Sequence, residues 1–123
     1  MKLSELLPPG GTGVIATADR NGAVNVAIYA APRLVDDDTV AWGMTAGRTY
    51  DNLRDNRNAS YLYRAPGNGV KGVRLTLLLQ KIEDAGKTLE EVKARAGAAV
   101  GPRAAEAVRY VAYFRVVETR PLM

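Results

Sequence analysis

Short runs of β-prone residues, each closed by a turn, follow one another along most of this 123-residue chain. Val24, Val26 and Ile28 alternate with other residues, which is the period of a strand with one buried face. Asn21-Gly22, just before them, is typical of a two-residue hairpin turn, because both residues tolerate positive φ. The runs lack the spacing of βαβ units, so they predict an antiparallel sheet.

The same patterns predict six strands and two main helices in the order β-β-β-α-β-β-α-β. Thr49 is the expected N-cap of the first helix, and Thr88 with Glu91 has the spacing of a capping box for the second. Leu75 to Leu79 is apolar enough to predict burial on both faces of its strand. Six strands in one short chain favour a small antiparallel barrel with helices at its side. The predicted strands are residues 13–18, 23–31, 39–45, 59–64, 73–83 and 109–119, and the helical segments are residues 48–56, 88–99 and 103–108.

The chain contains no histidine and no cysteine. This excludes a Ser-His-Asp or Cys-His nucleophile, a zinc site built from Cys and His, an iron–sulfur cluster, haem held by His or thiolate, and a disulfide. No metal site is expected either. Asp36, Asp37 and Asp38 are adjacent, whereas calcium loops place their ligands at alternate positions, so a solvated turn is the better interpretation. Redox chemistry would have to come from a bound cofactor.

The net charge of +4 lies entirely between Arg48 and Arg74, because the rest of the chain has equal numbers of basic and acidic residues. This segment is where an anionic partner is expected, although a solvated basic face would have the same composition. Its charged residues are Arg48, Arg54, Arg57, Arg64, Lys71 and Arg74 against Asp51 and Asp55.

The start of the first predicted helix has the parts of a phosphate site. A strand ending at Thr45 leads through Gly47 into Arg48 and Thr49. The first turn of a helix offers unpaired N–H groups, Arg48 can bind two oxygens at once, and Thr49 adds a hydroxyl. An ordinary capped helix with a surface arginine is the alternative interpretation.

Tyr61, Tyr63 and Arg64 could form a stacking platform for single-stranded nucleic acid on a small barrel. However, the two tyrosines alternate with Leu62, as residues do in a strand that packs one face on a core. Nucleic-acid binding is therefore the less favoured alternative.

No stretch of the sequence reaches the roughly 20 apolar residues of a membrane span. Glu5 lies inside the short apolar N-terminal stretch and Pro8-Pro9 follows it, which does not fit a secretory signal. We therefore expect a cytoplasmic protein with no membrane partner.

The order of elements and the segment Gly47-Arg48-Thr49-Tyr50-Asp51-Asn52-Leu53 resemble the FMN-binding split-barrel family related to pyridoxamine 5'-phosphate oxidase. The resemblance covers about residues 12 to 118, and its most specific part is a basic residue and a Thr followed by Asn-Leu three residues on. It implies a mainly β (α+β) fold, a six-stranded antiparallel split β-barrel with flanking helices, formed by a single domain over residues 1–123. It also implies FMN as the cofactor.

The resemblance assigns the FMN-binding residues by position. Arg48 and Thr49 would hold the phosphate, and Asn52 belongs to the same segment. One strand segment, Gly43, Met44 and Thr45, would line the ribityl chain and the isoalloxazine ring. A second segment, Ala27, Ile28 and Tyr29, would support the edge of the ring through main-chain groups.

The function implied is electron or hydride transfer, as a flavin reductase or an electron carrier, with the redox chemistry supplied by FMN and no catalytic side chain. A homodimer is implied as well, with Leu122 and Met123 of the partner near the flavin. The chain lacks the histidine that pyridoxamine 5'-phosphate oxidases use near their C-terminus, so vitamin B6 oxidation is not expected. A nucleic-acid-binding barrel and a non-catalytic flavin-binding module remain as alternatives, and the sequence does not specify the electron donor or acceptor.

Overall fold

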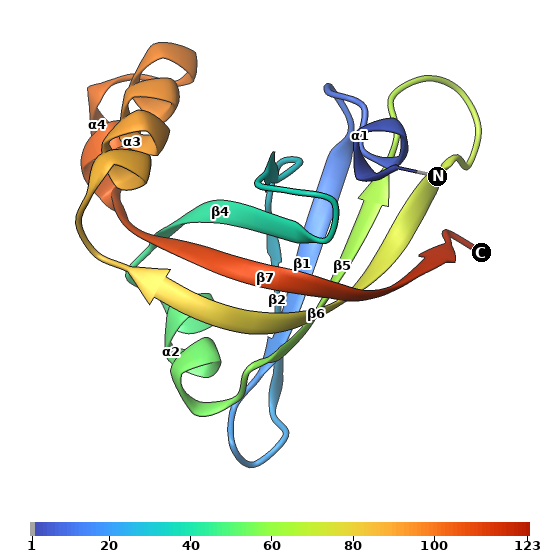
Figure 1. The fold of residues 1–123 in the computed structure, drawn as a ribbon, viewed down its shortest axis with the longest axis horizontal. Coiled ribbons are helices and arrows are strands. Elements are labelled where there is room, and N and C mark those ends of the chain that lie inside the picture. The colour runs from blue at the N-terminus through green and yellow to red at the C-terminus, as the bar shows by residue number, and fades with distance from the viewer. Residues whose placement is uncertain (1) are drawn as a thin grey trace.

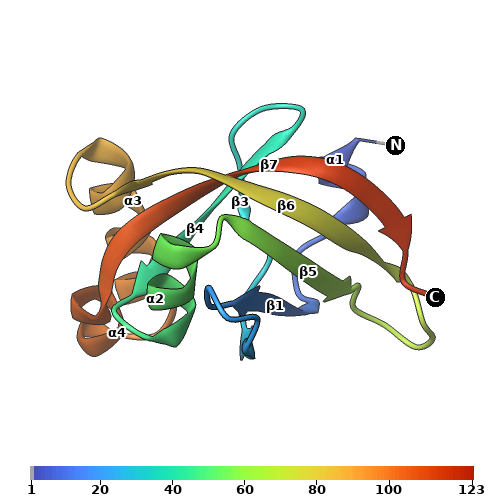
Figure 2. The ribbon, with the colours of Figure 1, turned by 90° about the horizontal axis from the view of Figure 1, so that it is seen from below.

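The computed structural model describes residues 2–123, and seven strands form one antiparallel sheet in the order β2-β1-β5-β6-β7-β4-β3. Figures 1 and 2 show the sheet curving, so that β4 and β7 cross over β1. Register shifts interrupt the pairing of β6 with β7 twice, and such bulges increase the local twist of a sheet. The strands are β1 (Thr12–Ala18), β2 (Val24–Ile28), β3 (Arg33–Leu34), β4 (Thr39–Thr45), β5 (Asn58–Arg64), β6 (Gly72–Glu83) and β7 (Val108–Pro121).

The prediction of a six-stranded barrel is wrong in two respects. The seventh strand, β3, follows Pro32, a residue that indicates either the end of a strand or an edge position. It pairs with Ala41 and Val40 of β4. An edge position suits it because one side of an edge strand needs no hydrogen-bond donors. The sheet also remains open, since β2 and β3 lie at its two ends and do not pair with each other.

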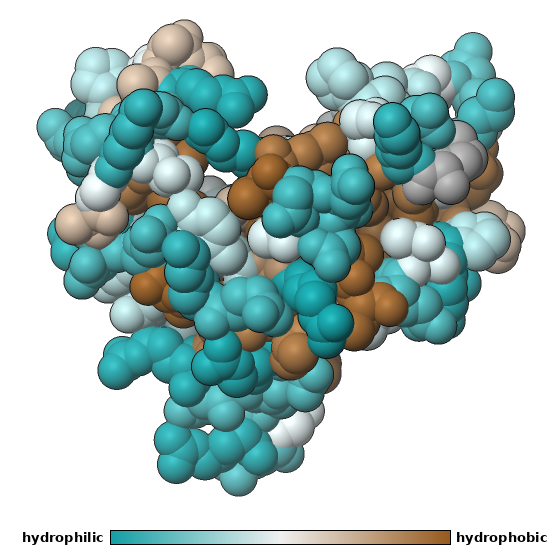
Figure 3. All heavy atoms as spheres, viewed as in Figure 1, coloured by the Kyte–Doolittle hydropathy of each residue, from teal (hydrophilic) through white to brown (hydrophobic). Residues whose placement is uncertain are grey.

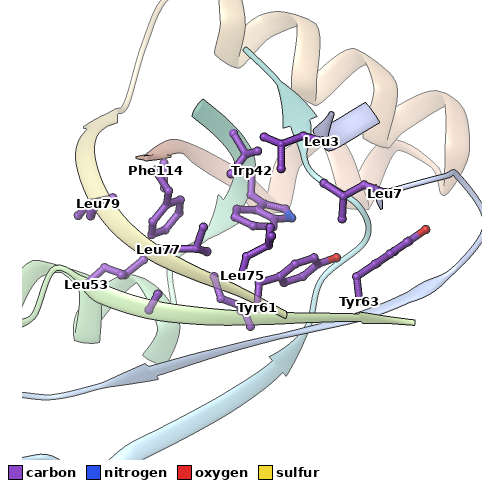
Figure 4. Close-up of a cluster of buried hydrophobic side chains, with 14 of the residues drawn as sticks. Leu3, Leu7, Trp42, Leu53, Tyr61, Tyr63, Leu75, Leu77, Leu79 and Phe114 are labelled. Carbon is purple, nitrogen blue, oxygen red and sulfur yellow. The ribbon is translucent and has the colours of Figure 1, made fainter. Parts of the chain in front are cut away.

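The main core fills the inside of this curved sheet, and Figure 4 shows its side chains pointing toward one another from several strands. Trp42 lies at its centre, with ring centroids 4.7 Å from Tyr61 and 5.5 Å from Phe114. The short helix α1 (Leu3–Leu6) adds Leu3 to the same cluster. Tyr61 and Tyr63 are 1% and 0% exposed, so they cannot serve as the stacking platform that nucleic-acid binding would need.

Three further helices flank the sheet: α2 (Arg48–Asp55), α3 (Lys87–Ala99) and α4 (Pro102–Ala107). Of these, α2 adds Leu53 to the main core. Helices α3 and α4 form a hairpin beside one end of β4 and β7 (Figure 1), over a second small cluster that includes Leu89 and Val92. The predicted caps are wrong. Gly47 and Gly86 occupy the N-cap positions, so Thr49 lies inside α2, and no side-chain capping bond forms at Thr88 in α3.

Burial along two strands was predicted from their patterns, and the prediction for β6 is wrong. Strand β2 alternates as expected, and its exposed face carries Val24, Val26 and Ile28, which are 79%, 66% and 80% exposed. The opposite face of the strand packs on the core, through Ala27 and then Tyr29. Strand β6 buries alternate residues rather than both faces, because only one side of the curved sheet faces the core.

Within residues 2–123, no helix combines the length and the apolar character needed to cross a bilayer.

Candidate functional site

The N-terminus of α2 presents free hydrogen-bond donors. The first main-chain hydrogen bond of the helix runs from the N–H of Asp51 to the carbonyl of Gly47, at 2.9 Å. The N-cap residue Gly47 makes no side-chain hydrogen bond to the helix. The N–H groups of the preceding helical residues therefore have no partner in the helix. Arg48 is exposed and forms no ion pair within residues 2–123. These N–H donors are therefore available to a ligand, whereas a side-chain cap would have occupied one of them.

Tyr29 joins the end of β2 to this helix. Burial raises the pKa of the Tyr29 phenol, and a hydrogen bond with the Thr49 side chain opposes that rise. The structure thus brings together the start of α2 and the end of β2, two segments that were separate in the sequence-based assignment. The main-chain groups of Tyr29 are already used, since its N–H donates to Gly13 and its carbonyl accepts from Tyr61 at 2.8 Å.

The outer edge of β2 remains open. Within residues 2–123, β2 pairs only with β1, and main-chain groups alternate in direction along a strand. The N–H of Tyr29 points to β1, so the main chain of Ala27 does too, and a support through main-chain groups is available from Ile28 at the outer edge.

Asn52 is placed away from the exposed end of α2. Its side chain is 6% exposed, and Nδ2 donates to Oγ1 of Thr17 at 3.1 Å. Thr17 is itself buried in β1. The amide therefore anchors α2 to the sheet, and contact with a cofactor stays a prediction.

The three predicted residues of β4 have different surroundings. Met44 is 1% exposed and belongs to the main core, whereas Thr45 is exposed at the end of the strand. Gly43 lies directly beneath Val92 of α3, and a Cβ at this position would collide with that side chain. A glycine here allows α3 to approach the strand closely.

Gly43 and Thr45 line a cavity of about 660 Å³ between α3, the end of β2 and β4, which we call the α3 cavity. Of the other residues assigned from the sequence, Ile28 and Tyr29 line it, whereas Ala27, Met44, Arg48, Thr49 and Asn52 do not. Figure 3 shows the molecular surface hollowed beside the α3–α4 lobe, with hydrophobic residues in the depression. The remaining lining residues are Ala30, Ala31, Pro32, Arg33, Ala41, Trp42, Val92, Arg95, Ala96, Ala99, Val100 and Val108.

The helical wall of this cavity was not predicted as part of the site. Val92, Ala96 and Ala99 recur at intervals of four and three residues, so they share one face of α3. That periodicity is visible in the sequence, but it indicates only a face that packs on something. The place where it packs, over Gly43, depends on the tertiary fold.

No protein-family model and no curated protein matches the chain. Solved structures do match it in fold. An FMN-binding protein from Syntrophomonas wolfei subsp. wolfei is 20% identical with a TM-score of 0.83, over 98% of this chain and 82% of that one. HupZ from Group A Streptococcus is 23% identical with a TM-score of 0.78, over 98% and 90% of the two chains.

Two further structures show how varied the ligands of this fold are. An F420 reductase is 18% identical with a TM-score of 0.73, over 95% of this chain and 94% of that one. HutZ, a haem storage protein from Vibrio cholerae, is 18% identical with a TM-score of 0.66. Identities this low show the fold alone. The open seven-stranded sheet with its flanking helices is therefore the fold of the FMN-binding split-barrel proteins, as the sequence resemblance implied.

Proposed function

We propose that this protein binds FMN and acts in electron or hydride transfer. The observation that carries the proposal is the uncapped start of α2, with Arg48 exposed beside it, at the end of a strand that lines the α3 cavity. Thr45 at the cavity and Arg48 at the helix start are three residues apart. FMN likewise carries a charged phosphate and an apolar ring joined by a short chain, so its two ends match the helix start and the cavity.

Several weak interactions would stabilise the FMN phosphate at the start of α2. The helix dipole contributes about 0.3–1 kcal/mol to a charge near the first turn. A hydrogen bond between ionised groups contributes about 1.5–3 kcal/mol, and the exposure of Arg48 favours the lower value. Thr49 is less accessible, at 7% exposed, so we expect its main-chain N–H rather than its hydroxyl to reach a phosphate.

The ring would lie against the lining that Ile28, Tyr29 and Gly43 provide. Bound FMN would supply the redox chemistry, which no side chain here can supply in its place. The chain's own part is to hold the ring, to exclude water with apolar walls and to offer the outer edge of β2 as a row of hydrogen-bonding groups. Tyr29, Arg33 and Arg95 are the titratable residues in the lining, and none is assigned as an acid or base.

We also propose a homodimer. Ile28, Val14 and Leu62 are neighbours across β2, β1 and β5, so they share the outer face of the sheet. Ile28 and Leu62 are 80% and 41% exposed, and Val24 and Val26 extend the patch along β2. Ile28 also lines the α3 cavity, so a second copy on this patch would cover the cavity mouth. Contacts from Leu122 and Met123 of the partner remain part of this proposal.

Haem is a less suitable ligand, although one protein of this fold stores it. The chain has no histidine and no cysteine, which are the commonest axial ligands of haem iron.

A flavin module without turnover differs from the main proposal only in activity, and reduction of the bound flavin by a nicotinamide cofactor would separate the two.

The test begins with the purified protein, its flavin absorbance and the mass of the ligand released on denaturation. FMN affinity is then measured by fluorescence quenching in Arg48→Ala/Thr49→Ala. We expect about a tenfold loss, because Arg48→Ala removes about 1.5 kcal/mol of phosphate interaction and Thr49→Ala leaves the main-chain N–H in place. Arg103→Ala in α4 removes one charge from an exposed site outside the lining and is the control. Unchanged FMN affinity in the double variant would refute the phosphate assignment.

A further inference from the structure

The α3 cavity has an unbalanced positive charge. Among residues 2–123, Arg33 and Arg95 are the charged side chains that line it. Arg33 is neutralised, because its Nη2 lies 2.6 Å from Oε2 of Glu91. Glu91 precedes Arg95 by one turn on α3, and it is already bonded to Arg33 across the cavity edge. Arg95 forms no ion pair within the described residues.

The other walls offer little for a polar ligand to bind. Val92, Ala96 and Val108 form one side, and the indole of Trp42 forms part of the floor. The one donor of that indole, Nε1, is used by the carbonyl of Ala30 at 2.8 Å. A ligand in this cavity therefore meets mainly apolar surface, the hydroxyl-bearing residues Tyr29 and Thr45, and one guanidinium without an ion-pair partner among residues 2–123.

We propose that the α3 cavity binds an apolar small molecule with a carboxylate, sulfonate or phosphate group, and that Arg95 recognises this group. A guanidinium binds two acid oxygens at once, which fixes the orientation of the ligand. Arg95 is exposed on α3, so water and salt screen this attraction and its strength depends on ionic strength. The cavity of about 660 Å³ is within the usual range for a small-molecule site, and the acid would occupy the part along α3 that the proposed flavin ring leaves open.

The role of this ligand rests on the proposed function. Ile28, Tyr29, Gly43 and Thr45 would contact FMN, and the residues contributed by α3 line the same cavity. An apolar acid held by Arg95 would therefore lie beside the flavin ring. This assigns a substrate class to the proposed flavoprotein: planar or compact apolar acids rather than sugars, amines or peptides.

The test uses two fluorescent probes of similar shape, 8-anilinonaphthalene-1-sulfonate and its uncharged analogue N-phenyl-1-naphthylamine. Both are titrated into the full chain as purified and again after saturation with FMN. We expect Arg95→Gln to weaken the sulfonate about tenfold and the neutral probe less than about twofold. Added salt should weaken the sulfonate in the wild type and have little effect in the variant.

Two controls locate the effect. Arg103→Gln removes an equal charge from α4 and should change neither probe. Ala96→Trp places a large ring in the cavity and should weaken both, which excludes binding on the exposed face of β2. Circular dichroism and the urea midpoint check that each variant is folded.

Three results would overturn the proposal. The first is equal sulfonate binding in Arg95→Gln and Arg103→Gln, and the second is full binding of both probes in Ala96→Trp. The third is loss of FMN in Arg95→Gln but not in Arg48→Ala, which would make Arg95 the ligand of the flavin phosphate. Failure of FMN to bind, together with the expected probe results, would instead refute the proposed function and leave this site standing.

Discussion

The buried hydrogen bond between Asn52 and Thr17 indicates that Asn52 supports the fold, whereas the sequence resemblance assigns it to the proposed FMN site. Asn52 Nδ2 lies 3.1 Å from Thr17 Oγ1, and the two residues are 6% and 4% exposed. Thr17→Val removes the acceptor and leaves a buried amide without that partner, which costs about 1–3 kcal/mol. We take about 2 kcal/mol as the central value.

The melting temperature should respond strongly in a chain of this size. An unfolding entropy of about 2.1 cal/mol/K per residue gives roughly 0.26 kcal/mol/K for the whole chain, so 2 kcal/mol lowers the melting temperature by about 8 °C. Asn52→Leu removes the buried amide itself and should cost less. The double variant Thr17→Val/Asn52→Leu replaces both polar partners by apolar groups of similar shape and should be close to the wild type.

The assay is thermal and urea unfolding of the four proteins at one protein concentration, with FMN affinity measured in parallel. Thr12→Val is the matched control, because Thr12 is an exposed residue of the same strand and should change stability by less than about 0.5 kcal/mol. If Asn52→Leu keeps its melting temperature but loses FMN tenfold, the amide faces the flavin and the structural interpretation is wrong. Additive costs in the double variant would show that the two side chains do not interact.

Two other predictions concern the surface of β2 and the buried tyrosines. Val26→Asp places a charge in the middle of the exposed apolar face and should convert a dimer to a monomer in sedimentation velocity. Asn21→Asp, in the adjacent turn, is the control. An unchanged mass for Val26→Asp would refute the interface. Burial, and then the charge of Tyr63, raise the pKa of Tyr61 above the ordinary value of 10.0. Because the folded state favours the neutral phenol, its contribution is complete below pH 10 and is lost as the pH rises above it. The urea midpoint should therefore fall above that pH and fall less in Tyr61→Phe, and equal slopes for the two proteins would contradict this.

Local patterns in the sequence predicted most elements to within two residues. The helix over residues 48–56 is observed as Arg48–Asp55, and the strand over residues 59–64 as Asn58–Arg64. Those boundaries depend on turn residues and on changes of period, which are local. The strand Arg33–Leu34 has no such period, since it consists of two residues held by pairing with β4. Its existence depends on the rest of the sheet.

The direction in which a strand faces could not be predicted in the same way. In β2 the alternation was correct, yet the larger apolar residues point outward and Ala27 points to the core. A single strand does not specify which face meets the core when a second surface also needs apolar residues. An exposed row of Val24, Val26 and Ile28 is therefore the expected result if β2 serves both a core and an interface.

The apolar residues form two clusters, and this division shows which residues of the α3 cavity also hold the fold together. The main core holds Trp42, Tyr61 and Phe114, and the second cluster holds Leu89 and Tyr113 with Val92 packed beside them. Trp42 belongs to the main core and also lines the cavity, so its substitution would damage fold and site together. Arg95 and Ala99 are exposed residues that line the cavity and belong to neither cluster, so substitutions there remove little buried packing. Under the proposed function, substitutions on α3 would therefore change which ligand the α3 cavity binds without altering the sheet or the start of α2.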